Sequence, residues 1–328
     1  MTILITGGAG YIGSHAVYEF LDAGYDVIVA DDLSTGSRDL LPPHIQFYQV
    51  NVGDQNAMNA VFKAHNIDAV LHFAGSIVVP ESVENPLKYY QNNSAVSLNL
   101  LTQCVQNGVK NFIFSSTASV YGNNKNQLMS EDTPTHPENP YASSKLITEM
   151  MLRDVSMAHG MNYAILRYFN VAGADPKGRT GQVKKDATHL IKVACQTALG
   201  LRSEIMIFGT DYDTHDGTCI RDYIHVSDLA NAHLLVYQQM IQQMIGGSVN
   251  KIYNCGYGRG FSVREVVQAV EKVAGCTLNK IMAPRRAGDP AALIANSEQL
   301  QKDTGWRPHL NDLETIIDSA LKWERSQM

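Results

Sequence analysis

"TILITGGAGYIGSH", residues 2–15, combines a short apolar run, a glycine-rich loop and the first residues of a helical pattern. The apolar run predicts a strand, and the apolar spacing after the loop predicts a helix over 11–23. Gly7 permits a tight turn, Gly10 lets a pyrophosphate approach the backbone, and Gly13 lets helix and strand pack closely. The helix N-terminus then offers free N–H groups and a partial positive charge to phosphates. This context predicts a dinucleotide-binding site, with a glycine-rich turn without ligand as the alternative.

An acidic residue follows where dinucleotide-binding folds need one. Asp31 ends the next apolar run, "DVIVAD" at 26–31, and lies 18 residues after Gly13. Such folds keep an acid about 20 residues beyond the glycines to bind the adenosine ribose. Asp32 comes next and would repel a 2′-phosphate, so NAD is favoured, while Arg38 further along the loop leaves room for NADP. A turn residue at a strand end is the alternative for Asp31.

Apolar runs and helical patterns alternate through the first half of the chain. Strands are predicted at 2–6, 26–31, 45–50, 69–74, 110–116 and 162–170, and helices near 11–23, 55–65, 87–107 and 141–159. This alternation indicates an α/β fold with a doubly wound parallel sheet, an NAD-binding Rossmann fold, covered by helices on both faces.

The second half of the chain is more irregular. Helical patterns at 186–199, 227–244, 262–274 and 310–325 are separated by loops and by short runs such as "EIMIF" and "KIYNCG". We therefore expect an NAD-binding domain at 1–170 and a smaller, mixed C-terminal substrate domain at 171–328, with about 225–257 returning to the first domain. The substrate domain is expected to cover the carboxyl edge of the sheet, where ligands bind in such folds.

Composition and charge exclude several classes of protein. The chain has 328 residues, 45% hydrophobic and 18% charged, which is typical of a globular protein with a sizeable core. A net charge of −6 without a Lys/Arg block argues against nucleic acid or an anionic membrane as partner. No apolar run approaches ~18 residues, so neither a signal peptide nor a membrane span is predicted. Five scattered cysteines without a CxxC pair indicate a reducing, cytoplasmic setting, and the histidines form no HExxH pattern, so no metal is predicted.

A tyrosine and a lysine share the start of one predicted helix. In "NPYASSKL" (139–146), Asn139 suits an N-cap and Pro140 a first helical position, so Tyr141 and Lys145 lie on one face. A phenol has a pKa of about 10 and acts as a base near pH 7 only where positive charge stabilises the phenolate. An ammonium within about 4–6 Å, a helix N-terminus and an oxidised nicotinamide ring would together supply that charge. The first turn of an ordinary surface helix is the alternative.

Hydroxyl side chains end the strand predicted at 110–116. Ser115, Ser116 and Thr117 follow one another where the strand meets the carboxyl edge of the sheet. The nicotinamide of a bound dinucleotide should lie at that edge. A Thr117 hydroxyl there could bridge Tyr141 and a substrate oxygen, which makes these side chains a candidate catalytic set.

Several motifs occur in the order found in one enzyme family. They are TGGAGYIG, HFAG (72–75), FSSTASVYG (114–122), YASSK and RYFNVAGA (167–174). In this order they resemble the extended short-chain dehydrogenase/reductases. The later "FGTDYDTHDGTCIRDYIHVSDLA" (208–230) and "APRRAGDPA" (283–291) are similar to the narrower UDP-glucose 4-epimerase family, and the resemblance covers essentially the whole chain.

The resemblance implies an NAD-dependent isomerase of carbohydrate metabolism. Such an enzyme interconverts UDP-glucose and UDP-galactose through a transient 4-keto sugar, so a UDP sugar is the expected substrate and 171–328 the UDP-sugar-binding domain. It also implies a homodimer, in which helices 87–107 and 141–159 could pair across a twofold axis.

Site residues carry over by matched position. The resemblance implies that Tyr141 is the acid/base, that Lys145 holds the nicotinamide ribose and lowers the tyrosine pKa, and that Thr117 assists. The residues implied for the cofactor are Gly7, Gly10, Tyr11, Ile12, Gly13, Asp31, Asn51, Phe73, Ala74, Gly75, Asn92, Tyr141 and Lys145. Those implied for the substrate are Thr117, Asn170, His189, Phe208, Arg221, Arg286, Asp289 and Leu293.

Four positions depart from the family pattern. Asn51 stands where an Asp usually meets the adenine, although an amide oxygen could accept the same hydrogen bond. Ile77 replaces a lysine that often meets the NAD pyrophosphate. "ATHL" (187–190) replaces Asn-Asn-Leu and places His189 beside the substrate phosphates or sugar. Leu293 occupies the position that helps gate the sugar pocket. Family members with a large residue there tend to use hexoses without an N-acetyl group, and members with a small residue tend to use N-acetyl sugars. Leucine is intermediate in size, so the choice of sugar stays open.

Three alternatives to this function compete with it. A 4-epimerase of another UDP sugar (UDP-GlcNAc/UDP-GalNAc or a UDP-pentose) is the nearest. A sugar-nucleotide 4,6-dehydratase usually carries Asp-Glu directly after the catalytic Thr, whereas Ala118 and Ser119 follow Thr117 here. A non-catalytic NAD-binding protein could dispense with Tyr141 and Lys145, yet both are present.

Overall fold

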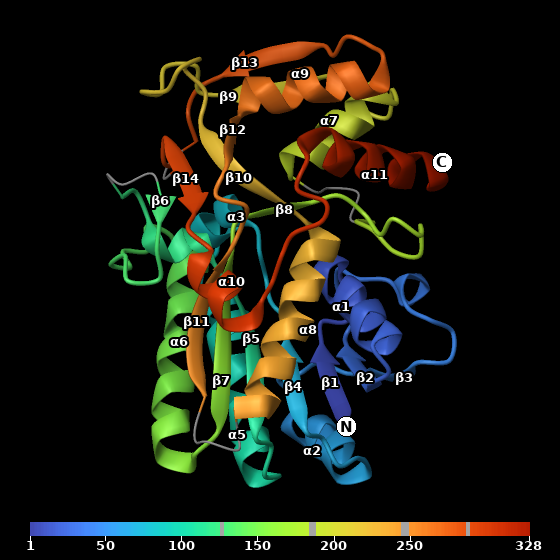
Figure 1. The fold of residues 1–328 in the computed structure, drawn as a ribbon, viewed down its shortest axis with the longest axis vertical. Helices are drawn as coiled ribbons and strands as arrows, with labels where there is room; N and C mark the ends of the chain where they lie inside the picture. Colours follow the sequence, from blue (N-terminus) through green and yellow to red (C-terminus); the bar gives the residue numbers. More distant parts are fainter. Residues whose placement is uncertain (125–127, 184–187, 244–248, 287–288) are drawn as a thin grey trace.

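The computed structural model describes residues 1–124, 128–183, 188–243, 249–286 and 289–328. The chain forms two parts that are stacked along the long axis of the molecule (Figure 1). The larger part contains the N-terminal strands and the long helices, and the smaller part is built mainly from the C-terminal half. Within the described residues, no helix is long and apolar enough to span a bilayer.

A seven-stranded parallel sheet forms the centre of the larger part, in the order β11-β7-β5-β4-β1-β2-β3. Its strands are β1 (Thr2–Thr6), β2 (Asp26–Asp31), β3 (Gln46–Gln49), β4 (Ala69–His72), β5 (Asn111–Thr117), β7 (Asn162–Tyr168) and β11 (Asn250–Cys255). Ile3 lies opposite Val27 of β2 on one side and Ala69 of β4 on the other. The strand order therefore reverses at β1, which creates a binding crevice at the carboxyl ends of β1 and β4. The predicted fold class is confirmed.

Helices cover both faces of this sheet (Figure 1). α1 (Tyr11–Asp22) and α8 (Val226–Gln243) pack on one face, and α2 (Gln55–Ala64), α5 (Val96–Gln106) and α6 (Pro140–His159) pack on the other. Ile3 and Ile5 belong to the core on the α1 side, and Leu4 belongs to the core on the α6 side. Burial on both faces explains why these strands read as continuous apolar runs.

The smaller part has its own sheet and its own core. Its strands are β8 (Asn170–Ala172), β10 (Ile220–His225), β12 (Gly260–Ser262), β14 (Ala292–Ala295) and β6 (Leu128–Met129), and β9 (Ile205–Phe208) pairs with β13 (Lys280–Ala283). Three helices pack together over them: α7 (Leu190–Ala198), α9 (Val263–Ala274) and α11 (Leu313–Ser326). α10 (Glu298–Thr304) contributes Leu300 to the core of the larger part, where α8 and β11 also lie.

The structure corrects two predicted elements. The strand expected at 162–170 is two strands, because the chain leaves the large sheet after Tyr168 and β8 joins β10 of the smaller sheet. The helix expected at 87–107 is interrupted by a π-helical segment, η2 (Tyr90–Ala95), between α4 (Pro86–Tyr89) and α5. A π-helical turn is rare and often marks a functional site. Short elements went unpredicted: α3 (Val79–Glu84), α10, and the 3₁₀ helices η1 (Arg38–Leu40) and η3 (Ala118–Tyr121).

Candidate active site

The glycine loop lies at the carboxyl end of β1, against the end of β4. Gly7 has a φ of +69°, and a Cβ there would lie 2.5 Å from the backbone nitrogen of Ala74. A Cβ on Gly13 would lie 2.2 Å from the carbonyl oxygen of Gly7. Gly10 precedes α1, whose first turn has neither a capping side chain nor an acidic residue. An uncapped helix start next to a close backbone approach fits the pyrophosphate of a dinucleotide.

Two carboxylates lie beside this loop. Asp31 Oδ2 accepts a hydrogen bond from the Ala9 N–H at 2.9 Å, and burial raises the pKa of Asp31. Asp32 accepts a bond from the Asn51 amide at 3.1 Å. Arg38 instead donates to backbone carbonyls, at 3.1 Å to Pro42 and 3.0 Å to Pro43. The two carboxylates suit the ribose diol of NAD. The Arg38 guanidinium, which could otherwise bind the 2′-phosphate of NADP, is bound to backbone carbonyls instead.

The other positions expected around the cofactor gather near β4 and η2. Phe73 follows β4, and its ring centroid lies 5.0 Å from that of His233. Gly75 lies close to the Lys145 ammonium, because a Cβ on Gly75 would be 3.6 Å from that nitrogen. Asn92 in η2 donates to the Ser76 hydroxyl at 2.9 Å. These contacts bring the ends of β4, η2 and α6 together at one crevice.

Tyr141 and Thr117 meet at the carboxyl end of β5. Asn139 caps α6, its side-chain oxygen accepting the Ala142 N–H at 2.9 Å, and Pro140 is the first helical residue, as predicted. The Thr117 side chain lies close to the Tyr141 phenol, near enough to affect its ionisation. Burial raises the pKa of Tyr141, and the nearby Thr117 side chain counteracts part of that rise. In the protein alone the phenol is therefore protonated near neutral pH, and it needs added positive charge to ionise.

Lys145 lies one helical turn beyond Tyr141 and is buried. Its ammonium donates to the Ser115 carbonyl at 2.9 Å and lies 5.0 Å from the centre of the Phe114 ring. Burial lowers the pKa of Lys145 to about 8, because the interior disfavours its charged form. A lowering of the Tyr141 pKa by Lys145 stays a prediction.

A second cluster gathers substrate positions in the smaller part. The Arg286 guanidinium lies 3.8 Å from the centre of the Phe208 ring, at the end of β9. Arg221 in β10 forms an ion pair with Asp289 at 3.3 Å, and it lies opposite Leu293 of β14. The fold thus brings five of the eight expected substrate residues together, although 208 and 293 are far apart in sequence. Two arginines beside an aromatic ring and a carboxylate suit a nucleoside diphosphate.

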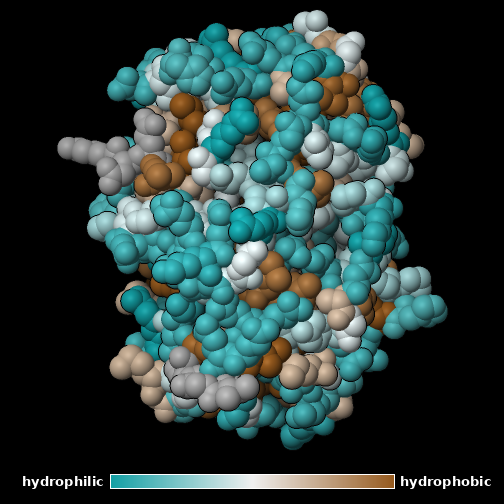
Figure 2. Space-filling model, viewed as in Figure 1, coloured by the Kyte–Doolittle hydropathy of each residue, from teal (hydrophilic) through white to brown (hydrophobic). Residues whose placement is uncertain are grey.

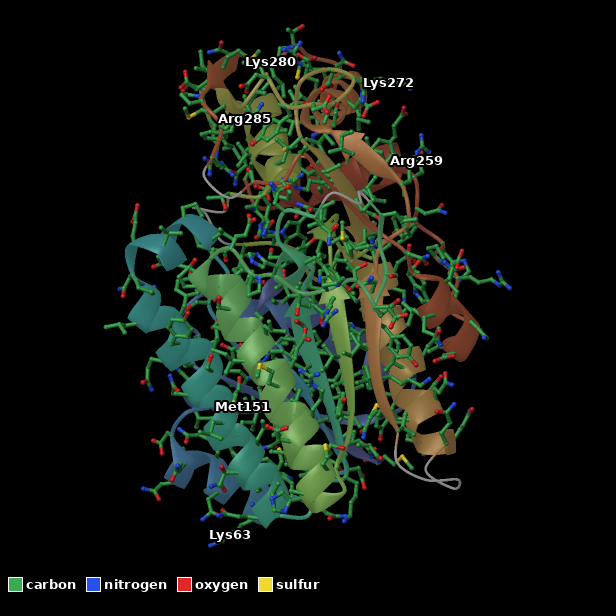
Figure 3. All side chains as sticks on the ribbon, turned by 90° about the vertical axis from the view of Figure 1, so that its left-hand side faces the viewer. Lys63, Met151, Arg259, Lys272, Lys280 and Arg285 are labelled. Carbon is green, nitrogen blue, oxygen red and sulfur yellow. The ribbon has the colours of Figure 1, made fainter. Side chains whose placement is uncertain are left out.

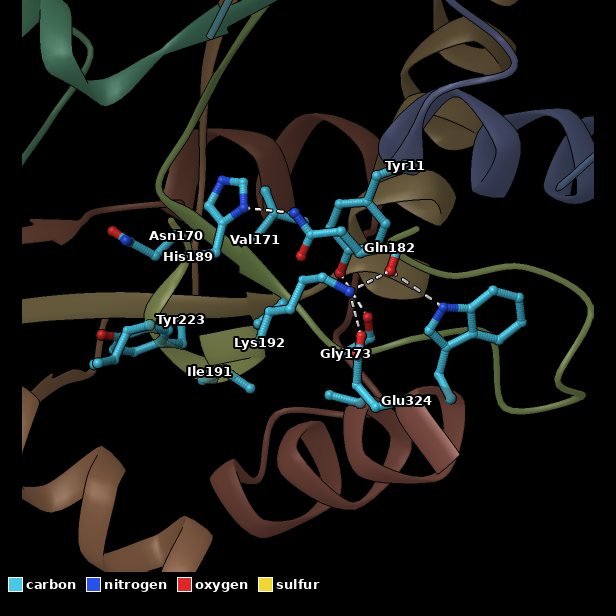
Figure 4. Close-up of a pocket in the computed structure, with 14 residues that line it drawn as sticks. Tyr11, Asn170, Val171, Gly173, Gln182, His189, Ile191, Lys192, Tyr223 and Glu324 are labelled. Atoms are coloured by element: carbon cyan, nitrogen blue, oxygen red, sulfur yellow. Dashed lines mark hydrogen bonds and ion pairs between the residues drawn. The ribbon is translucent and has the colours of Figure 1, made fainter. Parts of the chain in front are cut away.

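Asn170 and His189 line a separate small cavity between the two parts (Figure 4). Its volume is about 30 Å³, enough for about two water molecules. The Gln182 side-chain nitrogen lies 2.6 Å from His189 Nδ1. Tyr11, at the start of α1, closes the cavity from the other side and donates to the Gly173 carbonyl at 2.6 Å.

Two residues that sequence reasoning did not select also lie at these sites. Tyr223 lines the same cavity and is opposite Asn170 in the β8–β10 pair. Asn93 is buried within η2 and donates to the Ser76 carbonyl at 3.0 Å and to the Ser144 hydroxyl of α6 at 2.9 Å. Asn93 could have been selected from the sequence as a polar residue within a predicted helix. No sequence motif around Tyr223 indicated a role in the site.

Across the described ranges, no three His, Cys, Asp or Glu side chains gather as metal ligands would. The ionisable side chains of the site are instead the tyrosine, lysine, arginines and carboxylates already described. A doubly wound sheet with a glycine loop and a Tyr-Lys-Thr set at its carboxyl edge defines a dinucleotide-dependent enzyme.

The chain belongs to the NAD dependent epimerase/dehydratase family, whose sequence profile matches residues 3–256. It is 54% identical over 324 residues to UDP-glucose 4-epimerase of Azospirillum brasilense, covering 99% of this chain and 92% of that protein. A crystal structure of UDP-glucose 4-epimerase has a TM-score of 0.95 at 46% identity and covers 100% of this chain and 98% of that one. UDP-glucose 4-epimerase from Bifidobacterium longum, in complex with NAD+ and UDP, has a TM-score of 0.94 at 40% identity, covering 99% and 98%.

Proposed function

We propose that this chain is an NAD-dependent UDP-glucose 4-epimerase, which interconverts UDP-glucose and UDP-galactose. The observation that carries the proposal is the grouping of Tyr141, Thr117 and Lys145 at the carboxyl end of β5, at the same sheet edge as the glycine loop after β1. The identity of 54% to such an enzyme over nearly the whole chain supports it. This reaction would serve galactose metabolism. Five cysteines, none of them in a disulfide, support a reducing compartment such as the cytoplasm.

The proposed chemistry places one proton transfer on Tyr141. NAD, when bound, supplies reversible oxidation at C4 of the sugar. The Tyr141 phenolate oxygen takes the proton of the C4 hydroxyl as the 4-keto sugar forms, and returns it to the same oxygen afterwards. Thr117 holds the phenol and the sugar oxygen in line, and the N-terminus of α6 favours the phenolate. Lys145 is held by the Ser115 carbonyl at the position proposed for the nicotinamide ribose.

The residues of the smaller part are proposed to hold the UDP moiety. Arg221 and Arg286 would bind the diphosphate, Asp289 the ribose, and Phe208 would lie against the nucleotide. Epimerisation requires the 4-keto sugar to turn over between the two oxidation steps. Strong contacts to UDP with few to the sugar meet that requirement, because the nucleotide stays anchored while the sugar rotates.

Turnover of UDP-galactose tests the function directly. Purified protein should convert UDP-galactose to UDP-glucose without added reductant and without net release of NADH. Steady accumulation of NADH during turnover would instead indicate a dehydrogenase, and the absence of any conversion would rule the proposal out.

Leu293 is proposed to set the size of the sugar pocket. It is buried and packs in a cluster with Ala118 and Val120, which follow β5, and with Phe169, which follows β7. We expect Leu293→Tyr to lower kcat/KM for UDP-GlcNAc about 10-fold or more relative to UDP-glucose, because a larger ring fills the space that an N-acetyl group needs. Rates with both substrates measure the effect. Equal changes for both sugars would exclude Leu293 as a size filter.

The homodimer is proposed on the face formed by α5 and α6, which lie side by side in Figure 3. Large apolar side chains are exposed along these helices and the adjoining α4: Leu87 by 78%, Leu98 by 49%, Met150 by 50% and Met157 by 86%. Large apolar side chains exposed on neighbouring helices suit a protein–protein contact. A second copy of the chain is the proposed partner.

We expect the double substitution Leu98→Glu and Met150→Glu to convert a dimer into a monomer. The two new carboxylates of each chain place four at a symmetric interface, and each costs several kcal/mol without a partner. Sedimentation equilibrium measures the mass. Ile281→Glu, at an exposed apolar residue of β13 in the smaller part, is the control and should leave the mass unchanged. A wild-type monomer, or a dimer that survives both carboxylates, would contradict this interface.

A further inference from the structure

A buried ion pair lies behind the catalytic set and takes no part in the proposed chemistry. Glu149 follows Lys145 by one turn of α6, and Arg167 lies on β7 directly opposite Ser116 of β5. The two side chains are only 1% and 4% exposed. Two apolar residues would often stabilise a fold as well as a buried ion pair does, so this pair indicates a role beyond stability.

The geometry of the pair is fully satisfied. Arg167 donates from Nε and Nη2 to the two carboxylate oxygens of Glu149, at 3.1 and 2.6 Å. Its Nη1 donates to the Tyr121 hydroxyl at 3.0 Å, and that hydroxyl donates to the Asn254 side chain of β11 at 2.7 Å. Such a buried, bidentate arrangement is rigid, because no member can move without losing a bond.

Helix α6 contacts strand β5 through three successive turns. The first contact is Tyr141 with the Thr117 side chain, and the second is Lys145 with the Ser115 carbonyl. The third is the Ser116 hydroxyl, which donates to Glu149 at 2.5 Å. The three β5 residues are consecutive, so a slide or rotation of α6 would change all three contacts together. Arg167 of the neighbouring strand β7 holds Glu149 in this third contact, because it donates hydrogen bonds to both carboxylate oxygens.

We propose that Glu149 and Arg167 are a positioning pair, which sets the separation of the Tyr141 phenol from the Thr117 hydroxyl by locking α6 to β5 and β7. The inference rests on the proposed function of Tyr141 and extends it to two residues that touch neither cofactor nor substrate. Proton transfer between oxygens depends steeply on their separation, so a small shift of α6 lowers kcat while the distant UDP contacts stay in place.

Arg167→Lys is the variant that tests the pair. Lysine keeps the positive charge but cannot form two parallel bonds to Glu149 and also reach Tyr121. We expect kcat to fall about 10- to 100-fold, since misplacement on the order of 1 Å has effects of that size, with KM for UDP-galactose near its wild-type value. Leu152→Ala is the matched control, because Leu152 lies on the same helix and packs in the apolar core. It should lower the melting temperature and leave kcat nearly unchanged.

The outcomes separate positioning from stability and from the function itself. A loss of kcat in Arg167→Lys well beyond that of Leu152→Ala, at unchanged KM, supports the pair, and equal kcat in the two variants overturns it. If Arg167→Lys does not fold, the double variant Glu149→Met and Arg167→Met replaces it, because it leaves no buried charge unpaired. Its kcat and KM are then compared with those of Leu152→Ala. If the wild-type protein lacks epimerase activity, the proposed function fails by itself. Crystal structures then decide the inference: an unchanged Tyr141–Thr117 separation in the variant overturns it, and a widened one supports it.

Discussion

Tyr141→Phe is expected to reduce kcat by about 10²- to 10⁴-fold, the range that general acid–base catalysis contributes. The substitution removes only the phenolic hydroxyl, which lies close to the Thr117 side chain and is the group proposed to carry the proton. The ring remains, edge-on to Tyr89 with centroids 6.4 Å apart, so the fold around the start of α6 should persist. Initial rates with UDP-galactose and calorimetric titration with UDP measure the two consequences separately.

The affinity for UDP should stay at its wild-type value, because the Arg221–Asp289 cluster lies in the smaller part of the molecule. Tyr253→Phe serves as the control. This tyrosine is buried in the large sheet and loses one hydrogen bond, to Asp303 at 3.1 Å, but it lies on β11 away from the crevice. Turnover by Tyr141→Phe at a rate close to that of Tyr253→Phe would remove the phenol from the acid/base role.

Gly13→Ala is expected to abolish tight binding of NAD and to destabilise the fold by about 1–3 kcal/mol, the usual cost of an added methyl group in a packed site. The new Cβ would lie 2.2 Å from the Gly7 carbonyl oxygen and 2.8 Å from the Gly8 Cα, and both neighbours are backbone atoms. The loop or the helix must therefore move, and the N–H groups that approach the pyrophosphate move with it. Retention of NAD during purification and thermal unfolding with and without added NAD measure the effect.

Gly275→Ala provides the comparison for this loss. Gly275 follows the last residue of α9 with a φ of 68°, and a Cβ there would meet open space among the described residues. An alanine at this position therefore costs only about 1–2 kcal/mol of backbone strain. The two variants thus lose similar stability for different reasons. Normal stabilisation of Gly13→Ala by NAD, equal to that of Gly275→Ala, would show that the loop does not hold the pyrophosphate.

Much of the larger part could be predicted because its signals are local. The first strand, the glycine loop and the start of α1 are consecutive in the sequence. Glycine is required at positions 7 and 13 because neighbouring backbone atoms leave no room for a Cβ. The start of α6 was equally predictable, since an N-cap and a proline act on the residues that directly follow them. The same locality failed at Phe169, where the chain leaves one sheet for another. The apolar pattern does not change where the chain switches sheets, because the switch depends on pairing with β10 about fifty residues later.

The sequence by itself determined the dinucleotide fold, the Tyr141–Lys145 spacing and the start of the helix that carries them. The tertiary structure alone decided that Arg221 meets Asp289, that η2 is π-helical around Asn93, and that Glu149 is bound by Arg167. The physical reason is the range of the interactions. Capping, turn geometry and helical spacing act within a few residues, whereas ion pairs across strands exist only after the chain has lost the entropy of closing long loops.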